Sequence, residues 1–284
     1  MFERQRSGSV VCPGCNRLVE VDAAQCPHCG RVSPGMFGYA RTLQAFAGGE
    51  GFVRFVIATC ALLYVVTLLV GFQGLGSGGL MRLLSPSGET IFAFGSSGWL
   101  PVFQYGRWWT PLSASWLHGS LLHILFNMMW IRQLAPALIR LFGAGRTVLI
   151  YVVAGVSGFV LTSVVGHLLP GLPRILQGAA STVGASASIF GLFGALVLYG
   201  RRTGSAALGR QVWTWAAVLF VFGLVFPGID NWAHFGGFAG GYAAASYLDP
   251  RTPERPEHLL AALVCLALSL AAVVLSVLHY LAIR

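Results

Sequence analysis

Seven apolar stretches dominate this chain of 284 residues. They lie at 52–72, 117–141, 147–169, 185–200, 211–228, 231–248 and 258–281. A helix needs about 20 residues to cross the hydrocarbon of a bilayer, and stretches of about 17 to 25 residues are usual. The fourth stretch is shorter, so we expect a tilted core helix that its neighbours shield from lipid. The chain is therefore predicted to be an all-α polytopic membrane protein.

The composition agrees with this prediction. Hydrophobic residues make up 56% of the chain and charged residues only 10%, whereas about a quarter of a soluble domain is charged. The formal net charge of +9 could suggest a nucleic-acid partner. The basic residues, all of them arginine, are however spread among the apolar stretches rather than gathered on one face. We therefore expect no nucleic acid and read the arginines as orientation signals.

The arginine distribution predicts an orientation. With the N-terminus inside, four of the 18 arginines face outward and the remaining fourteen face the cytosol; the outer ones are Arg82, Arg107, Arg174 and Arg284. Cytosolic loops of membrane proteins carry an excess of arginine and lysine. An odd number of spans then places the C-terminus outside. We expect an integral protein of a bacterial inner membrane, with the first span serving as the insertion signal.

Four cysteines precede the first apolar stretch in two CxxC pairs. The pairs are Cys12 with Cys15 and Cys26 with Cys29, separated by ten residues. Two such turns can complete a tetrahedral zinc site of structural type. Two disulfides or a chance pattern are the alternatives. We expect His28 to be a bystander, because four thiolates fill the coordination shell.

This spacing resembles a zinc ribbon. We assign residues 1–32 to it and 33–50, rich in glycine and proline, to a linker. Zinc thiolates suit a reducing compartment, which agrees with a cytosolic N-terminus. The expected role is structural or the binding of a cytosolic protein partner. The remaining cysteines, Cys60 and Cys265, lie within apolar stretches and are expected to fill space there.

The loop from 73 to 116 is long and rich in aromatic residues. It contains Trp99, Trp108, Trp109 and Trp116. Amphipathic rings are stable in the headgroup layer of a membrane, so we expect the loop to lie there. It would act either as an ordinary aromatic belt or as a lateral shield or gate.

Polar residues that are costly in a bilayer recur at one depth. With the predicted orientation, His123, Ser186 and His234 all lie near the outer ends of spans that run inward. His123 and Asn127 are four residues apart and share a helix face. A serine, a histidine and hydrogen-bond donors are what acyl transfer requires. Taken singly, each has a structural explanation, such as a serine bonded to its own backbone or an asparagine between helices.

Small residues predict how Ser186 and His234 can meet. Gly184, Ala187, Gly191 and Gly194 surround the serine, and Gly237 and Gly241 follow the histidine. Stripes of small residues let two helices approach closely. If these two helices pack in this way, Ser186 and His234 form a dyad. Asp230 is expected to cap the helix of His234 rather than serve as a third acid.

At these residues the chain resembles the rhomboid family of intramembrane serine proteases, over roughly residues 52–248. The family pattern HxxxN occurs as His123 to Asn127, GxSx as Gly184 to Ala187, and AHxGGxxxG as Ala233 to Gly241. All three occur in the order usual for the family. The resemblance implies a six-helix core at 51–249, a cytosolic linker at 250–257 and a seventh transmembrane helix at 258–284.

The resemblance also implies roles for individual residues. Ser186 would be the nucleophile and His234 its general base. His123, Asn127 and the Ser186 N–H would form the oxyanion hole, and Phe190 would stack on the base. Gly184 and Gly237 belong to the same motifs as supporting residues. The family cleaves single-span membrane substrates near their outer end, after they enter from the lipid bilayer, and needs no cofactor for catalysis.

Two departures and two rivals remain. Where the family often has a Trp-Arg pair, this chain has Trp108-Trp109-Thr110 with Arg107 before it, which puts the anchoring of the loop in doubt. Ala187 stands where glycine is frequent. One rival function is an inactive rhomboid-like protein that binds membrane clients, but such proteins usually lack the serine or the histidine. The other is a transporter, which would need broken helices or charges near the midplane.

Overall fold

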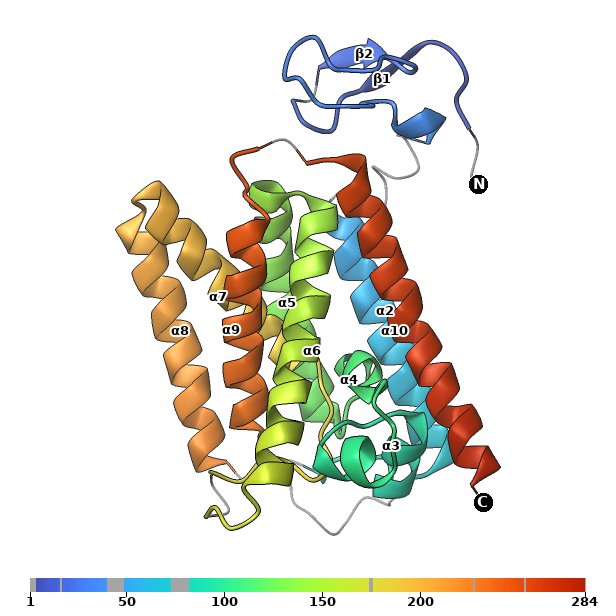
Figure 1. The fold of residues 1–284 in the computed structure, drawn as a ribbon, viewed down its shortest axis with the longest axis vertical. Coiled ribbons are helices and arrows are strands. Elements are labelled where there is room, and N and C mark those ends of the chain that lie inside the picture. Colours follow the sequence, from blue (N-terminus) through green and yellow to red (C-terminus); the bar gives the residue numbers. More distant parts are fainter. Residues whose placement is uncertain are drawn as a thin grey trace.

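The structure is a computed structural model that describes residues 4–15, 17–39, 49–72, 82–173, 176–226, 228–252 and 254–283. Half of the predicted linker, residues 40–48, lies outside the described residues, and so do Arg174 and Arg284. The described chain folds into a bundle of long helices with a small two-stranded unit at one end (Figure 1).

Seven long helices form the bundle. They are α2 (Gly49–Val70), α5 (Leu121–Phe142), α6 (Ala144–Leu168), α7 (Ser186–Thr203), α8 (Ala206–Val225), α9 (Asn231–Tyr247) and α10 (Pro256–Ala282). Within the described residues, five of them are long and apolar enough to cross a membrane: α2, α5, α6, α8 and α10. The predicted all-α polytopic membrane protein is confirmed.

Two helix starts differ from the predicted spans by four residues or more. The helix α5 begins at Leu121 rather than at 117, because the Ser120 hydroxyl accepts a hydrogen bond from the His123 N–H at 3.3 Å and caps it. The helix α8 begins at Ala206 rather than at 211, so Arg210 lies inside it. Hydropathy alone places a span at its apolar residues, whereas the helix extends into its polar ends.

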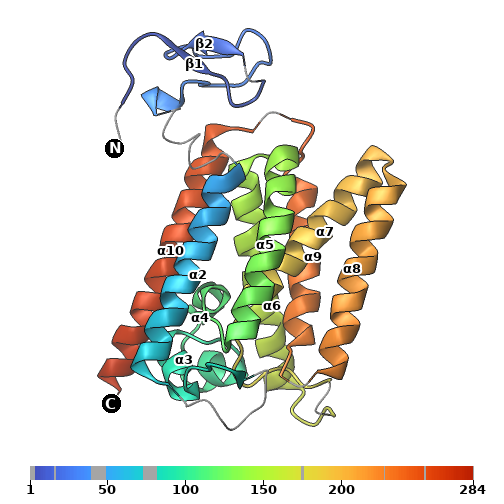
Figure 2. The same cartoon turned by 180° about the vertical axis from the view of Figure 1, so that it is seen from behind.

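The helix α7 is the buried centre of the bundle. Its residues from Ala187 to Leu198 are all buried, in agreement with the core helix predicted for the short fourth stretch. It packs against α6 and α9, and both views of the fold show α8 standing at the edge of the bundle (Figures 1 and 2).

Glycines set the spacing between α7 and α9. A Cβ atom at Gly237 would lie 2.1 Å from the carbonyl oxygen of Ala187, and one at Gly241 would lie 2.2 Å from that of Gly191. Such approaches exclude any side chain. The predicted close packing of these two helices through small residues is confirmed.

The segment between α2 and α5 is folded against the bundle. It contains α3 (Gly88–Phe94), the π-helical turn η3 (Leu100–Gln104), α4 (Thr110–Ser113) and the 3₁₀ turn η4 (Ala114–Trp116). Its tryptophans do not all lie in the headgroup layer as we expected. Trp108 is 74% exposed, but Trp116 is only 1% exposed and packs edge-on against Phe55. A buried aromatic ring in this segment stabilises its attachment to α2.

Arg107 anchors this segment, which resolves the doubt raised by the missing Trp-Arg pair. Its fully buried guanidinium donates to the carbonyls of Phe92 at 2.6 Å and Ser276 at 3.0 Å. The Trp109 indole also donates to the Ser276 hydroxyl at 3.0 Å. Because Ser276 belongs to α10, the seventh helix holds the segment in place.

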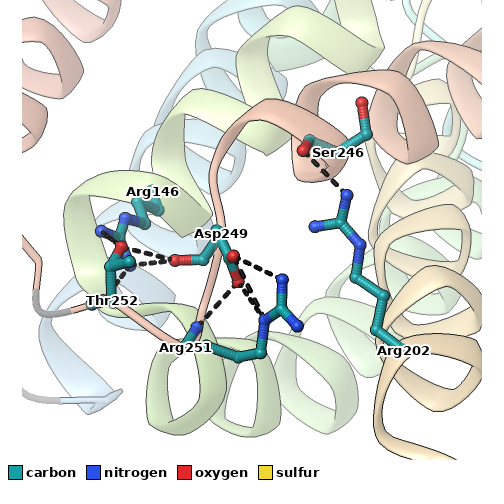
Figure 3. Close-up of polar contacts among 6 residues, drawn as sticks. All are labelled: Arg146, Arg202, Ser246, Asp249, Arg251 and Thr252. Carbon is teal, nitrogen blue, oxygen red and sulfur yellow. Dashed lines mark hydrogen bonds and ion pairs between the residues drawn. The ribbon is translucent and has the colours of Figure 1, made fainter.

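The connection between α9 and α10 is held by Arg146 at the start of α6. Its guanidinium donates to the carbonyls of Asp249 and Thr252, both at 2.8 Å (Figure 3). The Glu254 carboxylate accepts the Arg146 backbone N–H at 2.9 Å. The bond to Glu254 satisfies a backbone N–H in the first turn of α6 that has no partner within the helix.

The two-stranded unit lies at the end of the bundle opposite α3 and α4 (Figure 1). Strands β1 (Ser9–Val11) and β2 (Leu18–Glu20) pair antiparallel, and the short turn η1 (Met36–Gly38) follows them. The Gln5 N–H donates to the Gly38 carbonyl at 2.8 Å, so the packing extends beyond residue 32. The boundaries proposed for the domains stay predictions.

Candidate functional site

Ser186 and His234 meet between α7 and α9. The Nε2 atom of His234 lies 3.0 Å from the Ser186 hydroxyl oxygen, within hydrogen-bond distance. Ser186 is the first residue of α7 and is half-buried, while His234 is buried in the first turn of α9. A serine hydroxyl bonded to an imidazole nitrogen is the arrangement that activates an oxygen nucleophile.

Phe190 fixes the plane of the His234 ring. The two rings are stacked, with centroids 4.2 Å apart and an angle of 12° between their planes. The Nδ1 atom of His234 is buried and has no hydrogen-bond partner among the described residues. The ring is therefore oriented by stacking rather than by a carboxylate.

Asp230 caps α9, as the sequence predicted. Its side chain accepts the Ala233 N–H at 3.0 Å and the Thr162 hydroxyl at 3.0 Å, and its own carbonyl accepts the His234 N–H at 3.1 Å. The carboxylate thus fixes the first turn of α9 against α6 and is engaged away from the imidazole.

Gly184 allows α5 to approach the start of α7. Its φ is +129°, and a Cβ atom there would lie 2.5 Å from His123 Nε2 and 3.6 Å from Asn127 Nδ2. Both the backbone conformation and the lack of space require glycine. The side chains of His123 and Asn127 therefore lie beside Gly184, two residues before Ser186 in the chain.

Asn127 presents an unused donor. The residue is buried, and its Nδ2 atom has no hydrogen-bond partner among the described residues. The first N–H groups of α7, including that of Ser186, have no acceptor within the helix. A buried donor without a partner is costly in a folded protein, so this geometry favours binding of an acceptor at the site.

His118 and the segment before Ser186 are features of the site that the sequence did not assign. The buried His118 ring packs edge-on against His123, with centroids 5.1 Å apart. Ser97 and Thr182 exchange two backbone hydrogen bonds of 3.0 and 2.7 Å. These bonds attach the segment that leads into Ser186 to the loop before η3. Of these two features, only His118 could have been predicted from the sequence, because it lies close to the HxxxN pattern.

The four N-terminal cysteines gather at one point. Their sulfur atoms all lie within 4.8 Å of one another, and the Cys12–Cys29 and Cys15–Cys26 sulfur pairs are both 3.7 Å apart. A tetrahedron with zinc–sulfur bonds of about 2.3 Å has edges of about 3.8 Å. The donor set and its geometry therefore fit a metal ion with four thiolate ligands.

Local electrostatics differ among these thiols. Burial raises the pKa of Cys12 to about 12. Burial also opposes ionisation of Cys26, but the backbone N–H groups of His28 and Cys29 outweigh it and lower the pKa of Cys26 to about 7. A cation at the centre would stabilise all four thiolates.

Comparisons with known proteins match the part of the chain that contains Ser186 and His234. A family model described as "Rhomboid domain" matches residues 105–251. The chain is 32% identical over 189 residues to "Rhomboid protease GluP" of Bacillus subtilis, covering 65% of this chain and 35% of GluP.

Two plant relatives come from Arabidopsis thaliana. "RHOMBOID-like protein 4" is 34% identical, covering 56% of this chain and 39% of the relative. "RHOMBOID-like protein 7" is 33% identical, covering 56% and 49%. The chain thus spans between a third and a half of the length of these curated relatives.

Proposed function

The chain belongs to the rhomboid family, and on this premise we propose that it is an intramembrane serine endopeptidase that uses Ser186 and His234 as a catalytic dyad. The observation that carries the proposal is the 3.0 Å contact between the Ser186 hydroxyl and His234 Nε2. The stacked Phe190 and the donors around Gly184 support it.

In this mechanism His234 Nε2 removes the proton of the Ser186 hydroxyl as its oxygen attacks a peptide carbonyl. For Nε2 to accept a proton, the neutral ring must carry its own proton on Nδ1. The histidine then donates the proton it has gained to the leaving amine. Water hydrolyses the acyl-enzyme in a second step, so the site needs access to the aqueous phase.

The negative charge that develops on the carbonyl oxygen requires donors. We assign this role to Asn127 Nδ2, His123 Nε2 and the Ser186 N–H, all of which lie beside Gly184 or at the start of α7. Donors held in place before the reaction need no reorganisation when charge develops.

Asn127→Ala is expected to lower kcat by about 10²- to 10³-fold with a smaller change in KM, because the amide stabilises charge that is absent from the bound substrate. Steady-state cleavage kinetics in detergent measure both constants. Asn231→Ala is a matched control, since Asn231 lies at the start of α9 and outside the proposed oxyanion hole. A change confined to KM would contradict the assignment.

The expected substrates are single-span membrane proteins that enter from the bilayer and are cut near the outer face. Orientation follows from the arginines, with the N-terminal unit in the cytosol and the C-terminus outside, in a bacterial inner membrane. The dyad lies toward the end of the bundle that carries α3 and α4, which becomes the outer end in this orientation.

Labelling with a fluorophosphonate tests the proposal directly, because this probe reacts only with an activated serine. We expect the purified protein to be labelled at Ser186 and Ser186→Ala to remain unlabelled. Equal labelling of the wild type and Ser186→Ala would contradict the dyad. If the chain is an inactive client-binding protein, the main rival function, neither the wild type nor Ser186→Ala would be labelled.

We also propose that the cysteine cluster holds a structural zinc ion and that this unit binds a cytosolic protein partner. The support is the set of four sulfur atoms with 3.7 Å edges. Four thiolates leave no open coordination position, so the metal would have no direct part in catalysis.

Removal of zinc is expected to unfold the N-terminal unit, because binding of such a metal contributes about 10–16 kcal/mol to folding. The purified full chain should carry about one zinc per molecule. A strong chelator, or Cys12→Ser with Cys26→Ser, should make trypsin cut after Arg31, which is buried in the intact unit. Cys265→Ser is the control and should keep both the metal and the resistance. Full resistance without metal would refute the structural role.

A further inference from the structure

A cavity lies where α7 ends and α8 begins, at the end of the bundle that faces the N-terminal unit (Figure 1). Its volume is about 420 Å³, and Arg201, Ser205, Arg210 and Trp213 are among the residues that line it. Pockets of about 300–1,000 Å³ are typical of sites for small molecules. None of the proposed catalytic residues lines it, so the cavity needs an explanation of its own.

Within the described residues, neither Arg201 nor Arg210, the two arginines that line the cavity, forms an ion pair with a carboxylate. Residues 197–213 include Arg201, Arg202 and Arg210 but no aspartate or glutamate. Among the described residues Arg201 contacts a neutral side chain, Tyr242: its guanidinium lies 5.9 Å from the ring centroid and donates to the hydroxyl at 3.4 Å. For Arg210, the described part of the chain shows no ion pair.

The carboxylate of Asp249, which lies just after α9, is already bonded to another arginine. The Asp249 carboxylate accepts three hydrogen bonds of 2.8 to 3.2 Å from the Arg251 guanidinium, and Arg202 reaches the carbonyl of Ser246 instead, at 3.0 Å (Figure 3). The charge at the cavity is thus available to an external anion.

The position of the cavity indicates where that anion comes from. The helix α8 is a candidate membrane span, and its exposed apolar residues, among them Val218, Val221 and Val225, face outward beyond the cavity. Trp213 is 55% exposed and lies three residues beyond Arg210. An arginine followed by a tryptophan and then by apolar residues is the order expected where a helix enters the membrane. The cavity therefore lies at the depth of lipid headgroups.

The lining suits both parts of a phospholipid. Val197, Ala206 and Trp213 provide apolar surface, while the two arginines provide charged donors. The Ser205 side chain makes no capping bond, and the first turn of α8 has no acidic residue, so its N–H groups can add to the attraction of an anion.

We propose that this cavity, which we call the α7–α8 headgroup site, binds the phosphate of one anionic phospholipid between Arg201 and Arg210. The lipid belongs to the leaflet on the side of the N-terminal unit. A soluble phosphate would gain the charge interaction alone, whereas a lipid also fills the apolar lining.

Native mass spectrometry of the purified full chain in detergent tests this site. We expect dioleoyl phosphatidylglycerol to bind more tightly than dioleoyl phosphatidylcholine, and Arg201→Gln with Arg210→Gln to weaken phosphatidylglycerol binding about tenfold or more. Gly209→Leu should weaken it similarly with every charge retained. A Cβ atom at Gly209 meets nothing within 4 Å, so the larger side chain fills the cavity without strain at its base.

Matched variants separate the site from general charge attraction. Arg6→Gln with Arg140→Gln removes the same charge at the same end, and Gly88→Leu enlarges another glycine with open space, at the opposite end. Both should bind phosphatidylglycerol like the wild type. An equal loss in these controls would overturn the proposal. Binding that does not distinguish the two lipids, or displacement of phosphatidylglycerol by inorganic phosphate at equal concentration, would overturn it too.

Discussion

Ser186→Ala is expected to lower kcat for cleavage of a single-span membrane substrate by about 10⁶-fold, and His234→Ala by about as much. The two side chains act as one unit, since a serine hydroxyl is a weak nucleophile until a base removes its proton. Because they act through their 3.0 Å contact, loss of either side chain removes the contribution of the other to catalysis. The double variant should therefore be no slower than either single variant.

The measurement is cleavage of a generic type I membrane protein by purified protein in detergent, followed on a gel. Ser188→Ala is a matched control, because this serine lies on the same helix and contacts Ser115 at 3.4 Å instead of a histidine. It should keep most of the activity. Insertion and folding of each variant are checked by size exclusion. Cleavage that persists in Ser186→Ala would refute the proposed mechanism.

The meeting of α7 with α9 could be predicted because short-range sequence patterns encode it. Where two helices pack too closely for side chains, small residues recur at helical spacing on the contacting faces. The small residues around Gly237 and Gly191 show this spacing. The cap at Asp230 was equally local, since the carboxylate bonds a backbone N–H three residues on. Interactions within one helix turn are what a sequence pattern reports.

The anchoring of the segment between α2 and α5 could not be predicted in this way. Arg107 bonds carbonyl groups of Phe92 and Ser276, the second of them 169 residues away. Every residue carries a carbonyl, so an acceptor of this kind leaves no signal in the sequence. The backbone pairing of Ser97 with Thr182 has the same origin. Both contacts depend on α10 and the segment before Ser186 lying beside a loop that is distant in the chain.

The two kinds of contact together explain how the site is held. Helix packing without side chains fixes the distance between α7 and α9, while backbone pairing and the buried Arg107 attach the segment between α2 and α5 to the segment before α7 and to α10. The helix packing sets the position of the reacting atoms, and its contacts at Gly237 and Gly241 leave no room for a side chain.

Gly237→Ala is expected to destabilise the bundle strongly, by about 3 kcal/mol or more, because the added methyl group has nowhere to go. Its Cβ atom would lie 2.1 Å from the carbonyl oxygen of Ala187, a backbone atom that cannot rotate away. Thermal unfolding in detergent, followed by intrinsic fluorescence, measures the loss of Tm. Gly209→Ala, in the open part of α8, is the control and should leave Tm unchanged or raise it.

A second glycine distinguishes packing against backbone from packing against a side chain. A Cβ atom at Gly191 would lie 2.0 Å from the Ala154 methyl group, so Gly191→Ala should also lower Tm, and Ala154→Gly should restore part of the loss. No such partner substitution is available for Gly237, because its contact is a peptide carbonyl. If Gly237→Ala kept the wild-type Tm, α7 and α9 would have to lie farther apart than a 2.1 Å approach at Gly237 allows.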